Sequence, residues 1–104
     1  MQHHMESERL AADAEIAARR GDVVRARELY ELAGEAEVRA LSDLDPIKSR
    51  TYGISAVSAV SLYYKAVQLQ QAEQQAHLLM GTDRLPYFAA EELRALRIVG
   101  IHLE

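Results

Sequence analysis

Few side chains in this sequence could carry out chemistry. The chain has no cysteine, which excludes disulfides, thiolate metal sites and thiol nucleophiles. Of its four histidines, His77 is the one far from either end, and its acidic neighbour at helical spacing is Glu73. One histidine and one carboxylate are too few ligands for a metal ion, so we interpret His77 as a surface histidine paired with Glu73. We expect neither a metal nor a cofactor.

Three serines, Ser55, Ser58 and Ser61, precede Lys65 at helical spacing. Ser58 and Lys65 share a helix face but lie two turns apart, about 10 Å, which is too far for a Ser–Lys nucleophilic pair. The sequence contains no Gly-rich phosphate loop, nucleophile elbow or His-Glu-x-x-His pattern. Small hydroxyl side chains instead permit close helix packing or line a groove. We therefore expect no enzymatic activity.

The charged residues favour a solvated surface. A net charge of −4 at pH 7 disfavours nucleic-acid binding, which requires a basic stripe. Acidic and basic residues alternate along one segment, which contains Glu28, Glu31, Glu35 and Glu37 with Arg25, Arg27 and Arg39. This pattern is typical of a solvated helix face, and the alternative is an acidic docking surface. No apolar run reaches the roughly 18 residues of a membrane span, and the first residues lack the apolar stretch of a signal peptide. We expect a cytoplasmic protein that does not bind membranes.

The length of 104 residues indicates one domain, residues 1–104. Apolar residues recur every three or four positions, which predicts helices throughout. Glycine, proline and aspartate separate the predicted helices, which cover residues 6–20, 22–44, 49–66, 69–80 and 86–100. We expect Ser7 and Asp22 to cap the first two helices, Gly21 and Gly100 to follow the first and fifth, and Pro86 to begin the fifth. The predicted fold is all-α, with short connections and antiparallel neighbours.

Two stretches of the chain, residues 17–30 and 63–76, resemble each other. Each contains a helix end with a basic residue, a tight turn, an aliphatic residue and an alanine three residues later. The matching alanines, Ala26 and Ala72, are 46 residues apart. The sequence therefore predicts two related helical hairpins.

This pattern resembles the tetratricopeptide-repeat superfamily. The hairpin of that family has a turn of the kind Lys-x-Gly-Asp, an aromatic or aliphatic residue, and a small residue three positions further on. The first copy matches at Arg19-Arg20-Gly21-Asp22-Val23 and Ala26, and continues with Tyr30 and Ala33. The second copy matches at Tyr63, Tyr64, Lys65, Leu69 and Ala72, with Ala66-Val67-Gln68 in place of the glycine-containing turn. The resemblance covers residues 10–33 and 54–80.

The sequence also departs from the family pattern. The family period is about 34 residues, so a spacing of 46 implies a lengthened second helix and a linker at Asp45-Pro46. Leu10 and Ala56 replace the early aromatic residue of each hairpin, and Val60 replaces a small residue. The resemblance implies a short, divergent α-solenoid, with hairpins at about 6–44 and 49–80. The helix at 86–100 would then cap the open end of the stack.

In proteins that this chain resembles, the first helix of each hairpin lines a concave groove. Carried over by position, the candidate groove residues are Glu15 and Arg19 from the first hairpin and Ser58, Ser61, Tyr64 and Lys65 from the second, with Glu8, Ile54 and Val57 beside them. An amphipathic ring and a cation flanked by hydroxyls could hold an extended acidic or C-terminal peptide. The alternative is that Tyr64 packs on the fifth helix and Lys65 merely caps a helix end.

These observations favour a non-catalytic module that binds a protein or peptide segment. One alternative is a self-assembling structural protein, in which a second copy covers apolar residues such as Leu32, Val38, Leu44, Ile98 and Ile101. Another is an escort chaperone for a second protein, a role in which small acidic chains of this type are used.

Overall fold

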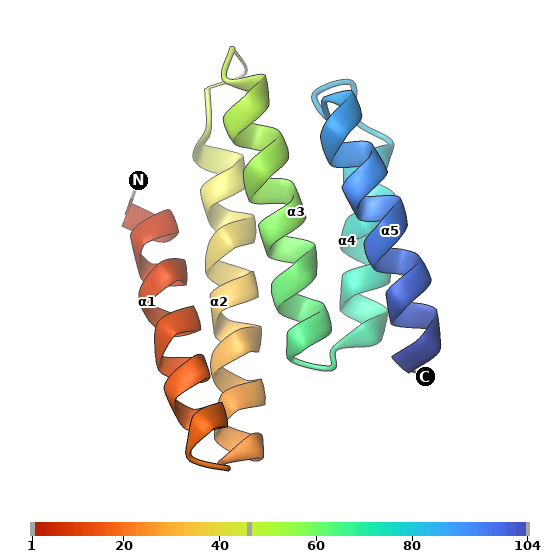
Figure 1. Ribbon diagram of the computed structural model, residues 1–104. Coiled ribbons are helices and arrows are strands. Elements are labelled where there is room, and N and C mark those ends of the chain that lie inside the picture. The colour runs from red at the N-terminus through yellow and green to blue at the C-terminus, as the bar shows by residue number, and fades with distance from the viewer. Residues whose placement is uncertain (1, 46, 104) are drawn as a thin grey trace.

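In the computed structural model, the described residues, 2–45 and 47–103, form five α-helices and no strand (Figure 1). The helices are α1 (Gln2–Arg19), α2 (Val23–Asp43), α3 (Ser49–Lys65), α4 (Leu69–Met80) and α5 (Tyr87–Leu103). The predicted all-α class is therefore confirmed, and each predicted helix overlaps an observed one. None of the described helices is both long enough and apolar enough to cross a membrane.

The five helices form two arrangements that share α3. Helices α1, α2 and α3 lie side by side as an antiparallel row, and α3 packs with α4 and α5 as a three-helix unit (Figure 1). The fold is flat, with Cα extents of 40 × 32 × 17 Å. Helix α2 consequently has a neighbour on each side, α1 and α3, and buries apolar residues on more than one narrow stripe.

The two predicted turns have the same hydrogen-bond pattern. After α1, Asp22 N–H donates to Ala17 O (2.9 Å) and Gly21 N–H to Ala18 O (3.0 Å). These two bonds define the Schellman motif, in which the residue after the C-cap has a positive φ, here Gly21 at 82°. Asp22 then caps α2, because its side chain accepts from Arg25 N–H at 3.1 Å.

The turn after α3 repeats this geometry at the positions 46 residues later. Gln68 N–H donates to Tyr63 O and Val67 N–H to Tyr64 O, both at 2.9 Å. Val67 has a φ of 59°, the left-handed conformation that glycine adopts in the first turn. A β-branched residue rarely adopts this conformation, because its Cβ meets the following carbonyl. The local chain reversal is therefore the same in both hairpins, although only one contains glycine.

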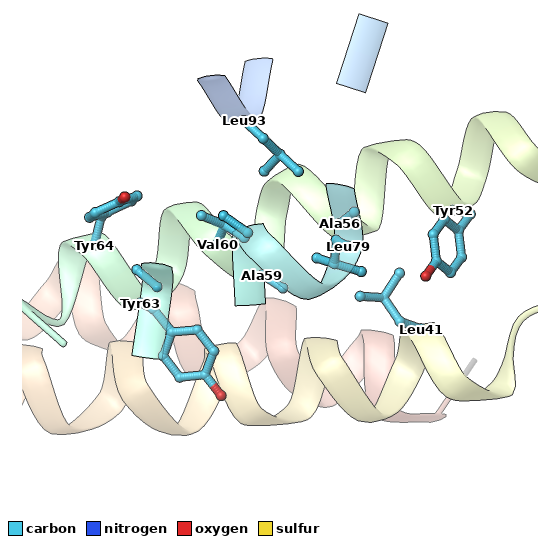
Figure 2. Packing of buried hydrophobic residues seen from close by; sticks show 11 residues of the cluster. Leu41, Tyr52, Ala56, Ala59, Val60, Tyr63, Tyr64, Leu79 and Leu93 are labelled. Carbon is cyan, nitrogen blue, oxygen red and sulfur yellow. The ribbon is translucent and has the colours of Figure 1, made fainter. Parts of the chain in front are cut away.

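Two apolar clusters hold the helices together. The larger one lies where α3 meets α2, α4 and α5, and includes Leu41, Val60, Tyr63, Leu79 and Leu93 (Figure 2). The smaller one is an alanine-rich seam between α1 and α2, and consists of Ala14, Ala17, Ala26 and Leu29. Small side chains let the axes of α1 and α2 approach closely. Ala26 and Ala72, the matching alanines of the repeat, are both buried.

Helix α5 packs closely against α3 at Gly53. A Cβ built on Gly53 would lie 2.6 Å from Pro86 Cγ and 3.0 Å from Phe88 Cζ. The sequence marks Gly53 as a weak point of the third helix, since glycine costs up to about 1 kcal/mol relative to alanine. The structure gives the reason for glycine here, because a larger residue would collide with the chain that enters α5.

Three sequence-based boundaries are corrected. Helix α1 begins at Gln2, so Ser7 is not an N-cap. It is buried within the helix, and its hydroxyl donates to Ala33 O of α2 at 3.0 Å. Helix α5 starts at Tyr87, one residue after Pro86, and continues to Leu103, so Gly100 does not end it. A glycine permits a helix end but does not enforce one.

Candidate binding face

Five of the six predicted groove residues occupy one face of the α1–α2–α3 row. On α3, Ser58, Ser61 and Lys65 follow Ile54 at spacings of four, three and four residues, which places them in one stripe along the helix. Ile54 and Lys65 are exposed, and the two serines are half-buried. This stripe of α3 therefore reaches the surface of the protein, and its part in binding stays a prediction.

Helix α1 supplies a second stripe, which carries Glu8, Glu15 and Arg19. All three are exposed, and Arg19 Nη2 lies 3.7 Å from Glu15 Oε2. Side-chain exposures of 79% for Arg19 and 54% for Glu15 leave this pair in water, where such a contact contributes little stability. Both side chains are free to reorient toward another molecule.

Tyr30 of α2 connects the two stripes. The Nζ atom of Lys65 lies over the Tyr30 ring, 5.7 Å from its centroid. Burial raises the pKa of Tyr30, the charge of Glu15 raises it further, and Arg19 acts in the opposite direction. Glu15 and Arg19 act on the hydroxyl of the same ring that Lys65 lies over, so side chains from three helices meet at one end of the face.

Tyr64 is not part of this face. It is 7% exposed and belongs to the core between α3, α4 and α5, and its hydroxyl donates to Glu73 Oε1 at 3.0 Å. Figure 2 shows Tyr63 and Tyr64 pointing in different directions from α3. Adjacent residues on a helix are about 100° apart, so Lys65 and Tyr64 cannot both line one narrow stripe. The groove assignment of Tyr64 is therefore corrected.

Glu73 is also placed differently from the sequence-based interpretation. Besides Tyr64, it accepts a hydrogen bond from Arg97 Nε at 3.0 Å, so it links α3, α4 and α5. His77 is exposed on α4. No group of three or more histidine or acidic side chains suited to a metal ion occurs among the described residues.

The opposite end of the face is built from the N-terminus of α1 and the C-terminus of α2. His4 lies between two carboxylates, with Nδ1 3.1 Å from Glu37 Oε1 and Nε2 3.1 Å from Glu8 Oε1. Glu37 is 1% exposed, so His4 of α1 contacts a buried carboxylate of α2. Since a neutral imidazole has one N–H, only the protonated ring can donate to both carboxylates.

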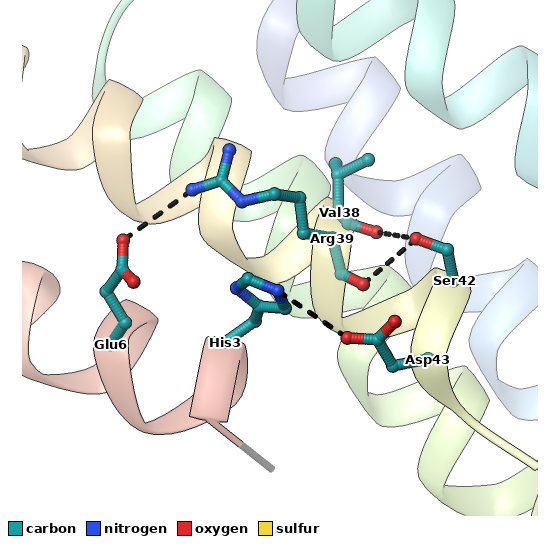
Figure 3. A network of polar contacts seen from close by, with 6 residues as sticks. All are labelled: His3, Glu6, Val38, Arg39, Ser42 and Asp43. Atoms are coloured by element: carbon teal, nitrogen blue, oxygen red, sulfur yellow. Dashed lines mark hydrogen bonds and ion pairs between the residues drawn. The ribbon is translucent and has the colours of Figure 1, made fainter.

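A second set of polar contacts lies beside this pair (Figure 3). His3 Nε2 is 3.7 Å from Asp43 Oδ2, and Arg39 Nη2 is 3.6 Å from Glu6 Oε1. These contacts join the first two turns of α1 to the last turns of α2. They fix the N-terminal end of α1 where the alanine seam gives way to polar residues.

A cavity of about 240 Å³ opens between these helix ends and α3. Its apolar lining is Ala40, Leu44 and Ile54, and its polar lining is His4, Asp43, Thr51 and Ser55. We call it the anchor cavity, and we call the surface between it and Lys65 the groove face. The groove face consists of the α1 stripe (His4, Glu8, Glu15, Arg19), the α2 stripe (Tyr30, Glu37, Ala40, Leu44) and the α3 stripe (Ile54, Ser58, Ser61, Lys65).

Sequence reasoning missed the contribution of α2. The resemblance assigned the lining to the first helix of each hairpin, whereas Tyr30 and Glu37 come from the second helix of the first hairpin. The signal was present in the sequence, since Tyr30, Glu37 and Leu44 follow one another at seven-residue spacing on α2. That spacing places them in one stripe, but the sequence does not say which neighbour the stripe meets.

The apolar residues named for self-assembly are distributed unevenly. Leu32 and Ile98 are exposed, at 44% and 61%. Val38 and Leu44 are half-buried and pack against the main core. The side chain of Ile101 lies outside the described part of the structure.

Comparison of the chain with protein families, with curated proteins and with solved structures found no match. The resemblance to tetratricopeptide repeats therefore remains a prediction from residues 10–33 and 54–80. The groove face must be interpreted from its own chemistry.

Proposed function

We propose that this protein is a non-catalytic interaction module, and that the groove face binds a segment of a partner protein. The observation that supports this proposal is the gathering of Glu15, Arg19, Tyr30 and Lys65 at one end of a face whose other end contains the anchor cavity. An aromatic ring, exposed charges of both signs and an apolar cavity are typical of surfaces that recognise a peptide.

The arrangement offers little to a chemical reaction. Ser58 and Lys65 lie two helical turns apart on α3, and the carboxylates of the face contact imidazole or guanidinium groups. A nucleophile requires a base within hydrogen-bond reach and a means of stabilising developing charge. The same side chains are well suited to binding, because several can form new contacts without leaving a buried group unpaired.

The test uses the partner obtained by co-purification from the native host and identified by mass spectrometry. Lys65→Glu and Arg19→Glu reverse two exposed charges of the groove face without entering the core. Arg94→Glu is the matched control, because Arg94 is about half exposed on α5 and pairs with Glu91. We expect the first two variants to weaken binding of the purified partner and the control to bind normally, and equal binding by all three would refute the proposal. Substituting Tyr64 would be a poor test, since its removal leaves a hole in the core.

Self-association is a second candidate, favoured by the exposure of Leu32 and Ile98. If a second copy of the chain covered these side chains, the apparent molecular mass would rise with the protein concentration. Sedimentation over a wide concentration range separates the two functions, because a strict monomer excludes self-assembly.

A further inference from the structure

The two ends of the groove face differ in charge. At the anchor cavity, the carboxylates of Glu8, Glu37 and Asp43 accompany the imidazoles of His3 and His4. The residues that line the cavity include the exposed carboxylate of Asp43 and, in the described part of the chain, neither lysine nor arginine, and the exposed carboxylate of Glu8 lies next to His4 at its edge.

The other end has an available cation. Lys65 is exposed, and its Nζ contacts the Tyr30 ring. Among the described residues, no carboxylate forms an ion pair with Lys65, whereas Arg19 beside it is paired with Glu15. A carboxylate of a bound molecule could therefore approach Lys65 without displacing an internal partner, and the Tyr30 ring would hold the ammonium in place.

The distance between the two ends sets the length of the ligand. Ile54 at the cavity and Lys65 lie on the same stripe of α3, eleven residues apart, which corresponds to about 16 Å at 1.5 Å per residue. An extended chain advances about 3.3 Å per residue. A strand-like segment would therefore cover the distance in about five residues.

The apolar wall of the cavity favours an aliphatic side chain over a charged one. Its volume of about 240 Å³ is below the usual range of small-molecule sites, and Ala40, Leu44 and Ile54 form its apolar wall. A side chain of leucine size would remove this wall from water. The carboxylates at the mouth would favour a basic residue next to it.

We propose that the groove face binds an extended segment in which an aliphatic residue next to a basic one occupies the anchor cavity, and an acidic residue about five positions away pairs with Lys65. This inference rests on the proposed function and specifies the chemistry of the partner. The partner is thus a segment with its positive charge at the cavity end and its negative charge at the Tyr30 end.

The probes are two fluorescent peptides. One has leucine and arginine at its start and aspartate five residues after the leucine, with serine and glycine between, and the other has the reverse order. Binding is followed by fluorescence anisotropy with the full chain at low salt, where surface charges are least screened. We expect one of the two orders to bind, and its affinity to fall at least about threefold with Lys65→Glu.

Two further measurements identify the ends of the segment. Replacing the aspartate of the probe by lysine should weaken binding to the unchanged protein and restore binding to Lys65→Glu. Thr51→Trp, at an exposed position of the cavity rim, should block the leucine and abolish binding of either probe, whereas Arg94→Glu should bind normally.

The outcomes separate this inference from the proposed function. One outcome is that Lys65→Glu and Arg19→Glu abolish binding of the native partner, but neither probe binds, or the lysine-containing probe does not bind Lys65→Glu. The groove face then binds a partner, and the inferred segment is wrong. If neither partner nor probes respond to these variants, both proposals are wrong. A concentration-dependent dimer that Thr51→Trp dissociates would assign the groove face to a second copy of the chain and overturn the inference.

Discussion

Val67 offers a sensitive test of the structure, because a β-branched residue at a φ of 59° carries backbone strain. The left-handed conformation costs an L-residue about 1–2 kcal/mol, and glycine avoids this cost. Glycine also gains freedom in the unfolded chain, which offsets about 0.4–1 kcal/mol of the benefit. Val67→Gly and Val67→Ala both lack the valine methyl groups, so the loss of the contacts of those groups cancels when the stabilities of the two variants are compared. We expect the glycine variant to exceed the alanine variant in stability by about 1 kcal/mol.

The matched control is Ala12→Gly. Ala12 is exposed within α1, where glycine should be less stable than alanine by about 1 kcal/mol. The free energy of unfolding with glycine, minus that with alanine, should therefore be positive at residue 67 and negative at residue 12. Urea denaturation at 25 °C measures both differences, and thermal melting should show shifts of about 4 °C or more. If glycine is less stable than alanine at both positions, residue 67 is not left-handed in solution and the equivalence of the two turns is wrong.

Three further predictions concern the packing. Gly53→Ala should destabilise the protein by about 1–3 kcal/mol despite the better helix propensity of alanine, because its Cβ would meet Pro86; a higher midpoint in urea would contradict this contact. Ala26→Leu should overpack the α1–α2 seam by a similar amount, and an unchanged melting temperature would refute the close approach of these helices. Burial raises the pKa of Tyr63, with Glu35 and Glu31 adding to the rise and Arg39 opposing it. As the pH rises, the Tyr63 side chain should therefore ionise in the unfolded chain before it ionises in the folded protein. The stability that its burial provides is fully present below about pH 10 and should be lost as the pH rises through the pKa of Tyr63 in the folded state. Tyr63→Phe should flatten that alkaline loss, as measured by urea denaturation between pH 8 and pH 11 (about one unit or more on either side of the ordinary value).

Local signals predicted most of the secondary structure. Apolar residues that recur every three or four positions predicted a helix at residues 49–66, and α3 spans Ser49–Lys65. Asp22 and Gly21 acted as predicted because capping depends on a few adjacent groups. Ser7 did not, since its burial against Ala33 depends on how α1 meets α2.

The structure places five of the six predicted groove residues on one face, and their role in binding stays a prediction. Glu15, Arg19, Ser58, Ser61 and Lys65 all lie on the groove face. A helical stripe can be recognised from spacing, so the grouping of the two serines with Lys65 required no knowledge of other helices. The anchor cavity could not be predicted, because it is formed by the ends of helices that are distant in the sequence.

The sequence by itself determined the five helices, their turns and the repeat of one turn geometry 46 residues later, because these features depend on contacts within a few residues of each other. The tertiary structure alone decided which stripe of each helix meets a neighbour. It buried Tyr64 and left Lys65 exposed, although the two are adjacent, because α4 and α5 cover the stripe of α3 that carries Tyr64, whereas none of the described helices covers the stripe that carries Lys65. It also brought Tyr30 beside Lys65, since the packing of α2 on α3 is set by the summed burial of many side chains and not by any local signal.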